Sequence, residues 1–139
     1  MEAMVVAQYI INRCTIEGNP ISNLQLQKIL YYVQVACLQE LGEPCFDDPI
    51  EAWQFGPVVR AVYYQYCGFG AFPIDWEYDS IISDSRKKTI IDTVIDEKKN
   101  LPPWALVFDD YSPGKAWSRV YKNNSPKATI SLRDMRLYG

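Results

Sequence analysis

Residues 112–115, with the sequence SPGK, are the first candidate for chemistry, because they resemble the end of a phosphate-binding loop. That loop requires a glycine at the position of Asp109 and a serine or threonine at the position of Ala116. Neither is present, and no hydrophobic strand leads into the segment. A surface turn is therefore the better interpretation.

Two pairs of neighbouring carboxylates, Asp47-Asp48 and Asp109-Asp110, are of the type that can hold Mg²⁺. Adjacent side chains rarely point in the same direction, and each pair stands beside a turn-forming proline or serine. We therefore interpret both pairs as solvated turns or helix caps.

The chain contains four cysteines and no histidine. Cys45 follows a proline in a predicted loop and is expected to be the most exposed thiol, but no neighbouring cation would lower its pKa. The other three lie in apolar helical patterns, which is typical of buried free thiols. Without histidine, Ser-His and Cys-His nucleophile pairs and most catalytic zinc sites are excluded. We predict no catalytic residue, no metal site and no cofactor.

The composition is that of a globular protein, with 139 residues, 48% of them hydrophobic and 22% charged. A net charge of −3 argues against general nucleic-acid binding, which requires a basic face. No apolar run approaches the roughly 20 residues that span a bilayer, and Glu2 stands where a signal peptide would be basic. We expect a cytoplasmic protein without membrane contact.

Hydrophobic periodicity predicts a mainly α, compact single domain over residues 1–139, with five to six helices and one or two short strands. The predicted helices cover residues 3–14, the stretch from the Ser22 cap to Gly42, the stretch from Pro57 to about 67, 84–98, 104–108, and the residues after Ser131, with a further turn around 116–121.

Residues 22–59 carry the clearest local patterns. Ser22 and Gln25 have the spacing of a capping box, and Gly42 is placed to end the helix that follows. Residues 50–55 alternate between apolar and polar types, which predicts a short strand. Pro57 is then expected to open the next helix, because a proline at the first helical position loses no hydrogen bond.

This stretch resembles the Panacea domain, the family that includes SocA-type antitoxins and GepA-like phage-associated proteins. The resemblance is carried by LQLQKILYY, a G-x-P-x-F step and I-x-A-W-x-F-G-P-V-V, in matching order and spacing from Ile21 to Tyr66. The matching residues are Leu26, Gln27, Lys28, Leu30, Tyr31, Gly42, Pro44, Phe46, Ala52, Trp53, Gly56, Pro57, Val58, Val59 and Tyr63. Further on, Asp109-Asp110 replaces the Thr-His pair of the family, and only Trp117 remains of its Pro-Trp pair.

The resemblance implies a module of a toxin–antitoxin system, often carried by prophages or mobile elements, that neutralises a toxin by direct contact. Some relatives instead act as adaptors that deliver a bound toxin to a protease. An enzyme that uses Asp or Tyr side chains with a metal is a third hypothesis. Other antitoxins carry an added DNA-binding domain, and we expect none here.

Aromatic residues make up 14% of the chain, which fits either an aromatic-rich core or a protein interface. The residues expected to contact a partner are Lys28, Tyr31 and Tyr32, projecting from the side of their helix opposite the apolar stripe, together with Trp53, Phe55 and Arg60. Alternatively, Trp53 is buried as the anchor of the Gly-Pro turn. A structural role is expected for Leu26, Leu30, Gly56, Pro57, Val58 and Tyr63.

Overall fold

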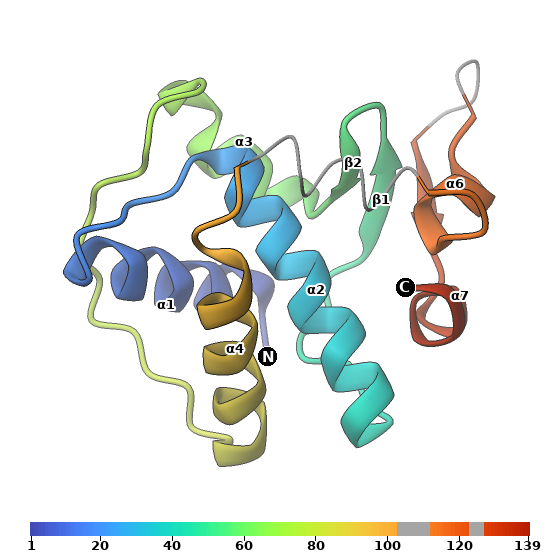
Figure 1. Cartoon of the computed structure of the whole chain (residues 1–139), viewed down its shortest axis with the longest axis horizontal. Helices are drawn as coiled ribbons and strands as arrows, with labels where there is room; N and C mark the ends of the chain where they lie inside the picture. The colour runs from blue at the N-terminus through green and yellow to red at the C-terminus, as the bar shows by residue number, and fades with distance from the viewer. Residues whose placement is uncertain (103–111, 123–126) are drawn as a thin grey trace.

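The computed structural model describes residues 1–102, 112–122 and 127–139. The described residues form six helices: α1 (Ala3–Ile16), α2 (Asn23–Leu41), α3 (Arg60–Tyr66), α4 (Ser85–Lys98), α6 (Ala116–Val120) and α7 (Leu132–Tyr138). They also form a 3-10 turn, η1 (Cys67–Phe69), and three strands, β1 (Ile50–Trp53), β2 (Gly56–Val58) and β3 (Ala128–Ile130). The predicted mainly α fold is confirmed (Figure 1). The helix predicted over 104–108 lies outside the described residues.

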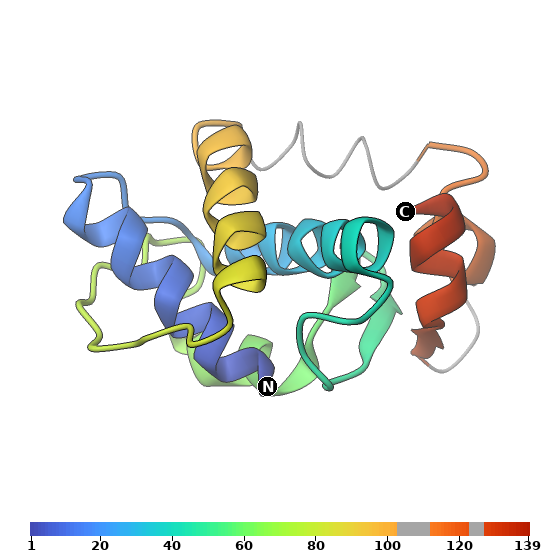
Figure 2. The ribbon, with the colours of Figure 1, turned by 90° about the horizontal axis from the view of Figure 1, so that it is seen from below.

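Helix α2 runs through the centre of the molecule (Figures 1 and 2). It packs against α1 and α4 on one side and against β2 and α7 on the other. The predicted apolar stripe is buried at Leu26, Ile29, Leu30, Val33 and Cys37. Because neighbours surround most of α2, several of its polar residues are buried as well.

The ends of α2 confirm the predicted caps. The hydroxyl of Ser22 accepts a hydrogen bond from the backbone N–H of Gln25, and the Gln25 side chain accepts one from the N–H of Ser22, which completes the capping box. Gly42 ends the helix with φ of 71°, a left-handed conformation that favours glycine. Local sequence is therefore sufficient to place this helix.

A buried glutamine holds the loop that follows α2. The Gln34 side-chain oxygen accepts hydrogen bonds from the backbone N–H groups of Cys45 at 2.8 Å and Phe46 at 3.2 Å. Its amide nitrogen donates to the carbonyl of Phe46 at 2.9 Å. This loop is irregular, so its buried backbone groups need such partners from outside the loop.

The prediction that Pro57 opens a helix is wrong. Residues Gly56–Val58 form β2, which pairs antiparallel with β1, Trp53 opposite Gly56 and Ala52 opposite Pro57. Since β2 is an edge strand in the order β2-β1-β3, Pro57 can occupy it without breaking a sheet hydrogen bond. Helix α3 begins only at Arg60.

The third strand brings the C-terminal residues to the sheet. Strand β3 pairs antiparallel with β1, with Ile50 opposite Ile130. Strand β3 is not among the elements expected from the sequence, because three residues are too few to show a period of two. After β3, the predicted helix that follows Ser131 is confirmed as α7, and the hydroxyl of Ser131 caps it by accepting a hydrogen bond from the N–H of Asp134.

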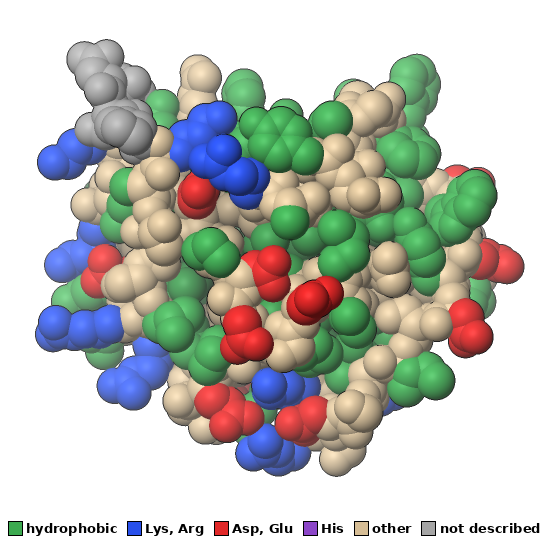
Figure 3. All heavy atoms as spheres, turned by 180° about the vertical axis from the view of Figure 1, so that it is seen from behind, with side chains coloured by type: hydrophobic (Ala, Val, Ile, Leu, Met, Phe, Trp, Pro, Cys, Tyr) green, Lys and Arg blue, Asp and Glu red, His purple; other side chains and the backbone are tan. Residues whose placement is uncertain are grey.

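Charged side chains are unevenly distributed over the chain. Residues 112–139 contain six lysines and arginines and one acidic residue, whereas residues 71–84 contain four acidic residues and no basic one. In Figure 3, which shows the molecule from behind, most Lys and Arg side chains lie toward the left, on the side of α6 and α7. None of the helices in the described residues has the length and apolar character needed to span a bilayer.

An ion-pair network joins the end of α1 to α4. The guanidinium of Arg13 donates to Glu17 at 2.8 Å and to Asp96 at 2.5 Å. Lys99 donates to Glu17 at 2.8 Å. The hydrogen bond from Lys99, and next the one from Arg13, hold the pKa of Glu17 below its ordinary value. The hydrogen bond from Arg13 does the same for the pKa of Asp96.

We expect stability to fall in acid through this network. A carboxylate with a lowered pKa stabilises the folded state above its unfolded pKa, near 4 for Asp and Glu, and loses that contribution as the pH falls through its folded pKa. In Arg13→Met, the urea midpoint should be lower than in the wild type at pH 7, and the difference should shrink as the pH falls from about 5 to about 2. Urea titrations at several pH values measure this, and a pH-independent difference would contradict the role of Arg13.

Candidate functional site

The residues that suggested chemistry have structural explanations in the described part of the chain. Asp48 accepts a hydrogen bond from the backbone N–H of Ala3 at 2.8 Å and so caps α1, as expected for a helix cap. Residues 112–115 form a turn closed by a hydrogen bond from the Lys115 N–H to the Ser112 carbonyl. Asp109-Asp110 lies outside the described residues. Among the residues described, no three Cys, Asp or Glu side chains lie close enough together to hold a metal ion.

The exposed thiol is Cys67, and the expectation for Cys45 is wrong. Cys45 is fully buried because Gln34 holds its backbone beneath α2. Cys14 and Cys37 are also buried, whereas Cys67 is exposed at the end of α3. Its thiol donates to the carbonyl of Tyr64 at 3.2 Å.

Lys28 and Tyr31 do not project from α2 as expected. Both are buried, because the β1–β2 hairpin and the neighbouring elements cover this face of the helix as well. The ammonium group of Lys28 donates a hydrogen bond to the carbonyl of Phe55 at the tip of the hairpin. Tyr32 is partly buried, with the ammonium of Lys98 lying 4.4 Å from its ring centroid.

The other three expected contact residues lie in the β1–β2 hairpin or just after it. Trp53 is buried, in agreement with its alternative role as anchor of the turn. Phe55 is 62% exposed, and Arg60 is exposed at the start of α3. Arg60 donates to the carboxylate of Glu51 at 3.0 Å. Phe55 at the tip of the hairpin and Arg60 at the start of α3 are therefore the exposed members of the expected contact set.

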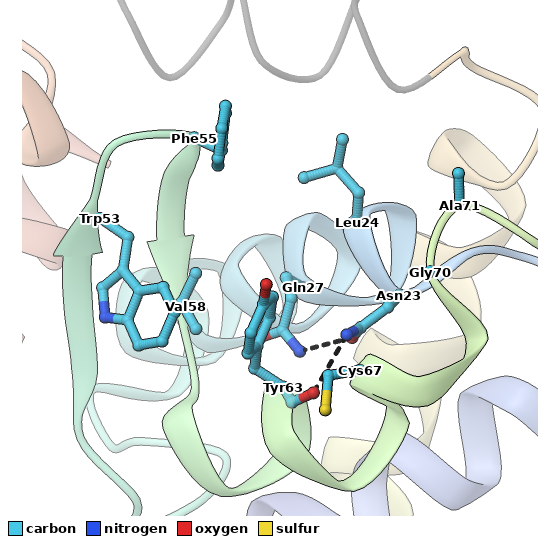
Figure 4. A pocket seen from close by; sticks show the side chains of 10 residues that line it. All are labelled: Asn23, Leu24, Gln27, Trp53, Phe55, Val58, Tyr63, Cys67, Gly70 and Ala71. Atoms are coloured by element: carbon cyan, nitrogen blue, oxygen red, sulfur yellow. Dashed lines mark hydrogen bonds between the residues drawn. The ribbon is translucent and has the colours of Figure 1, made fainter.

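A groove of about 330 Å³ lies between this hairpin, the start of α2 and the α3–η1 segment (Figure 4). Figure 4 shows Trp53 and Val58 on one side of it and Leu24 and Ala71 on the other, with Tyr63 between them. The complete lining is Asn23, Leu24, Gln27, Trp53, Phe55, Val58, Tyr63, Cys67, Gly70 and Ala71. The groove is therefore lined mainly by apolar and aromatic side chains, as is typical of binding sites.

The two amides that line the groove bond to the protein itself. The side-chain nitrogen of Asn23 donates to the carbonyl of Tyr63 at 3.1 Å, and that of Gln27 donates to the oxygen of Asn23 at 3.0 Å. The oxygen of Gln27 accepts from the backbone N–H of Val59 at 2.9 Å. These bonds join α2 to Val59, just before α3, and to Tyr63 within α3. They therefore fix the distance between the groove walls.

Trp53 connects the groove to its charged rim. Its ring centroid lies 4.9 Å from that of Tyr63, and its indole N–H donates to Glu51 at 2.8 Å. On the Trp53 ring, the ammonium of Lys127 lies 3.6 Å and the guanidinium of Arg60 lies 5.9 Å from the centroid. An apolar groove thus lies beside two cations that both lie over one indole ring.

A family model described as Antitoxin SocA-like, Panacea domain, matches residues 26–118. The chain belongs to this family. A curated relative, Antitoxin SocA of Caulobacter vibrioides (strain NA1000 / CB15N), is 40% identical over 63 residues. The match covers 45% of the chain but only 34% of that relative, so the two proteins share about a third of the relative's length. No solved structure matches the chain.

The structure explains why the two halves of the Panacea motif occur together. In the first half, the side-chain oxygen of Gln27 accepts a hydrogen bond from the backbone N–H of Val59 in the second half. The ammonium of Lys28 donates one to the backbone carbonyl of Phe55, also in the second half. Downstream, the indole N–H of Trp117 donates to the carbonyl of Trp53 at 2.7 Å and ties α6 to the sheet. The motif therefore describes one hydrogen-bonded unit that builds the groove.

The structural role of Asn23, Gln27 and Gln34 is not among the expectations from the sequence. Their spacings of four and seven residues place them on one face of α2, and this regular polar spacing inside a buried helix was the available indication. A polar face of a helix is usually exposed to solvent. Only the tertiary structure shows that this one hydrogen-bonds to backbone groups of other segments.

Replacing Gln27 by leucine tests this unit. Gln27→Leu keeps the approximate shape but leaves the Val59 N–H and the Asn23 oxygen without their partner, which should lower the free energy of unfolding by about 1–3 kcal/mol. Gln65→Leu is the matched control, since Gln65 is exposed on α3 and should change stability by less than about 0.5 kcal/mol. Urea unfolding measures both, and equal effects would argue against the proposed role of Gln27.

Thiol labelling tests the exposure of the groove edge. In the folded protein, we expect one of the four thiols to react rapidly with Ellman's reagent, and Cys67→Ser to remove that reaction. Burial is the main cause that raises the pKa of Cys14, to about 11, which further slows that thiol. A second fast thiol in native buffer would show that one of the buried cysteines is accessible.

Proposed function

We propose that this protein is the antitoxin of a toxin–antitoxin pair and that it neutralises its toxin by direct contact, without catalysis. Its membership of the Antitoxin SocA-like family and its similarity to a protein named Antitoxin SocA support the antitoxin role. The observation that carries the proposed contact is the groove, whose lining includes Gln27, Trp53, Phe55, Val58 and Tyr63 of the family motif. Phe55, exposed at its rim, is the most accessible aromatic of that motif.

The groove fits an apolar side chain of the toxin. Protein interfaces are dominated by a few aromatic or aliphatic anchors that fill desolvated pockets. An anchor placed against Trp53 and Tyr63 would meet little competing polar surface, because Asn23 and Gln27 are already hydrogen-bonded. Arg60 is already paired with Glu51, so the ammonium of Lys127 at the Trp53 ring is the cation that favours an acidic toxin residue next to the anchor.

A proteolytic adaptor would make the same toxin contact and add a contact to a protease. The two functions differ in the lifetime of the toxin. Direct neutralisation leaves toxin turnover unchanged or slower, whereas an adaptor makes it faster. A pulse-chase of the toxin with and without this protein therefore separates them.

We expect Phe55→Ala to weaken toxin binding. Truncating an aromatic residue that carries binding energy costs about 2 kcal/mol, which raises Kd by roughly 30-fold. The measurement is titration of the purified protein with the product of the neighbouring gene, after co-expression has shown that this product is toxic alone and co-purifies. Leu137→Ala is the control, because Leu137 is a similarly exposed apolar residue on α7.

Two outcomes would overturn the proposal. A neighbouring gene product that is harmless alone and does not co-purify would remove the antitoxin role. Equal affinities of Phe55→Ala and Leu137→Ala would leave a complex but place its contact away from the groove.

A further inference from the structure

The connector between η1 and α4 is a second surface with unusual composition. Residues 71–84, here called the strap, run in an extended conformation along α1 (Figures 1 and 2). Hydrogen bonds tie alternate strap residues to α1: Trp76 N–H to the Thr15 hydroxyl at 3.3 Å, Tyr78 N–H to the Asn12 side-chain oxygen at 2.9 Å, and the Ser80 hydroxyl to the Val5 carbonyl at 3.2 Å. The backbone of the strap is therefore held in place.

Every fourth side chain of the strap points inward. Ile74 and Ile82 are buried, and Tyr78 is half-buried with its hydroxyl 2.8 Å from that of Tyr66. Between these anchors, Trp76 is 60% exposed and Ile81 is 76% exposed. Since the anchors already fix the backbone, folding of the strap does not require large apolar side chains at the outward positions.

At its start, the strap also exposes Phe72, of which 76% is accessible. Large apolar side chains held outward on one ordered segment are typical of an interaction surface, because single exposed residues are common but repeated ones are not. The strap begins at Ala71, which lines the groove, and its backbone then leads away from the groove along α1.

Acidic residues alternate with the exposed apolar ones. Asp75, Glu77 and Asp79 are all exposed, and none of them takes part in an ion pair among the described residues. Figure 3 shows Asp and Glu side chains among hydrophobic ones at the right-hand edge, which carries the strap, without the Lys and Arg side chains of the opposite edge. The strap is therefore both apolar and negatively charged.

We propose that the strap is a docking surface, additional to the groove, for a lysine- or arginine-rich amphipathic segment of a protein partner. Its carboxylates repel phosphate backbones and anionic membranes, which leaves a basic polypeptide as the complementary occupant. The apolar residues of such a segment cover Trp76 and Ile81, while its cations pair with the carboxylates. The basic α7 of a second copy is a poorer occupant. The strap and α7 lie on opposite sides of the molecule (Figure 1), so a strap-to-α7 contact between two copies is head-to-tail and does not close into a dimer.

A synthetic peptide tests the proposal. The probe is a fluorescein-labelled peptide of four Arg-Leu repeats, and fluorescence anisotropy measures its binding to the full chain at low salt and at 0.3 M salt. We expect saturable binding that weakens in salt, and about tenfold weaker binding to the double variant Asp75→Asn, Glu77→Gln. The matched control is Glu40→Gln, Glu97→Gln, which removes two exposed carboxylates elsewhere and should bind like the wild type.

Two further variants separate the parts of the proposal. Trp76→Ala should weaken peptide binding, and because Trp76 is exposed the variant should keep the wild-type urea midpoint. Phe55→Ala should leave peptide binding unchanged, so the strap can be assessed whether or not the groove binds a toxin. Absence of saturable binding, or equal affinities of the two double variants, would overturn the proposal. Concentration-dependent self-association in sedimentation, lost in Trp76→Ala, would replace the basic partner by a second copy.

Discussion

The fold depends on polar side chains of the central helix that bind backbone outside any helix. Gln34 binds the loop after α2, Gln27 binds the N–H of Val59, and Lys28 binds the carbonyl of Phe55. A buried backbone group without a partner costs about 1–3 kcal/mol, so the irregular segments around α2 are stable only where these side chains reach them. The helix and the hairpin are therefore one hydrogen-bonded unit, and the groove lies between them and the α3–η1 segment.

Local interactions explain what the sequence could predict. The capping box at Ser22 and the left-handed Gly42 act within one turn of the helix, so their patterns identify α2 and its ends without reference to the rest of the fold. Pro57 is the contrasting case, because a proline after a glycine suits both the first turn of a helix and an edge strand. Pairing of β2 with β1 decides between them, and that pairing depends on residues that are not local to Pro57.

The same distinction applies to the candidate site. Phe55 and Arg60 are accessible as expected, since Phe55 lies in the tight turn of the hairpin and Arg60 is the first residue of α3, where few neighbours could bury a side chain. For Lys28 and Tyr31, the prediction assumed that a helix with one apolar stripe exposes its other side. Helix α2 is covered on both sides, and a lysine inside it is stable because the hairpin supplies a carbonyl acceptor. The apolar pattern of a helix alone does not show that a second element, here the hairpin, covers its other side.

The groove and the strap differ in how much substitutions of their residues lower the stability of the fold. Gln27 and Trp53 both shape the groove and stabilise the fold, so substitutions that would alter the groove also lower stability. In the strap, the inward anchors and the bonds to α1 provide the stability, while Trp76 and Glu77 are exposed. Substitutions at these outward positions change the surface with little effect on the fold. The strap is therefore the part of this surface where a new contact costs the least stability.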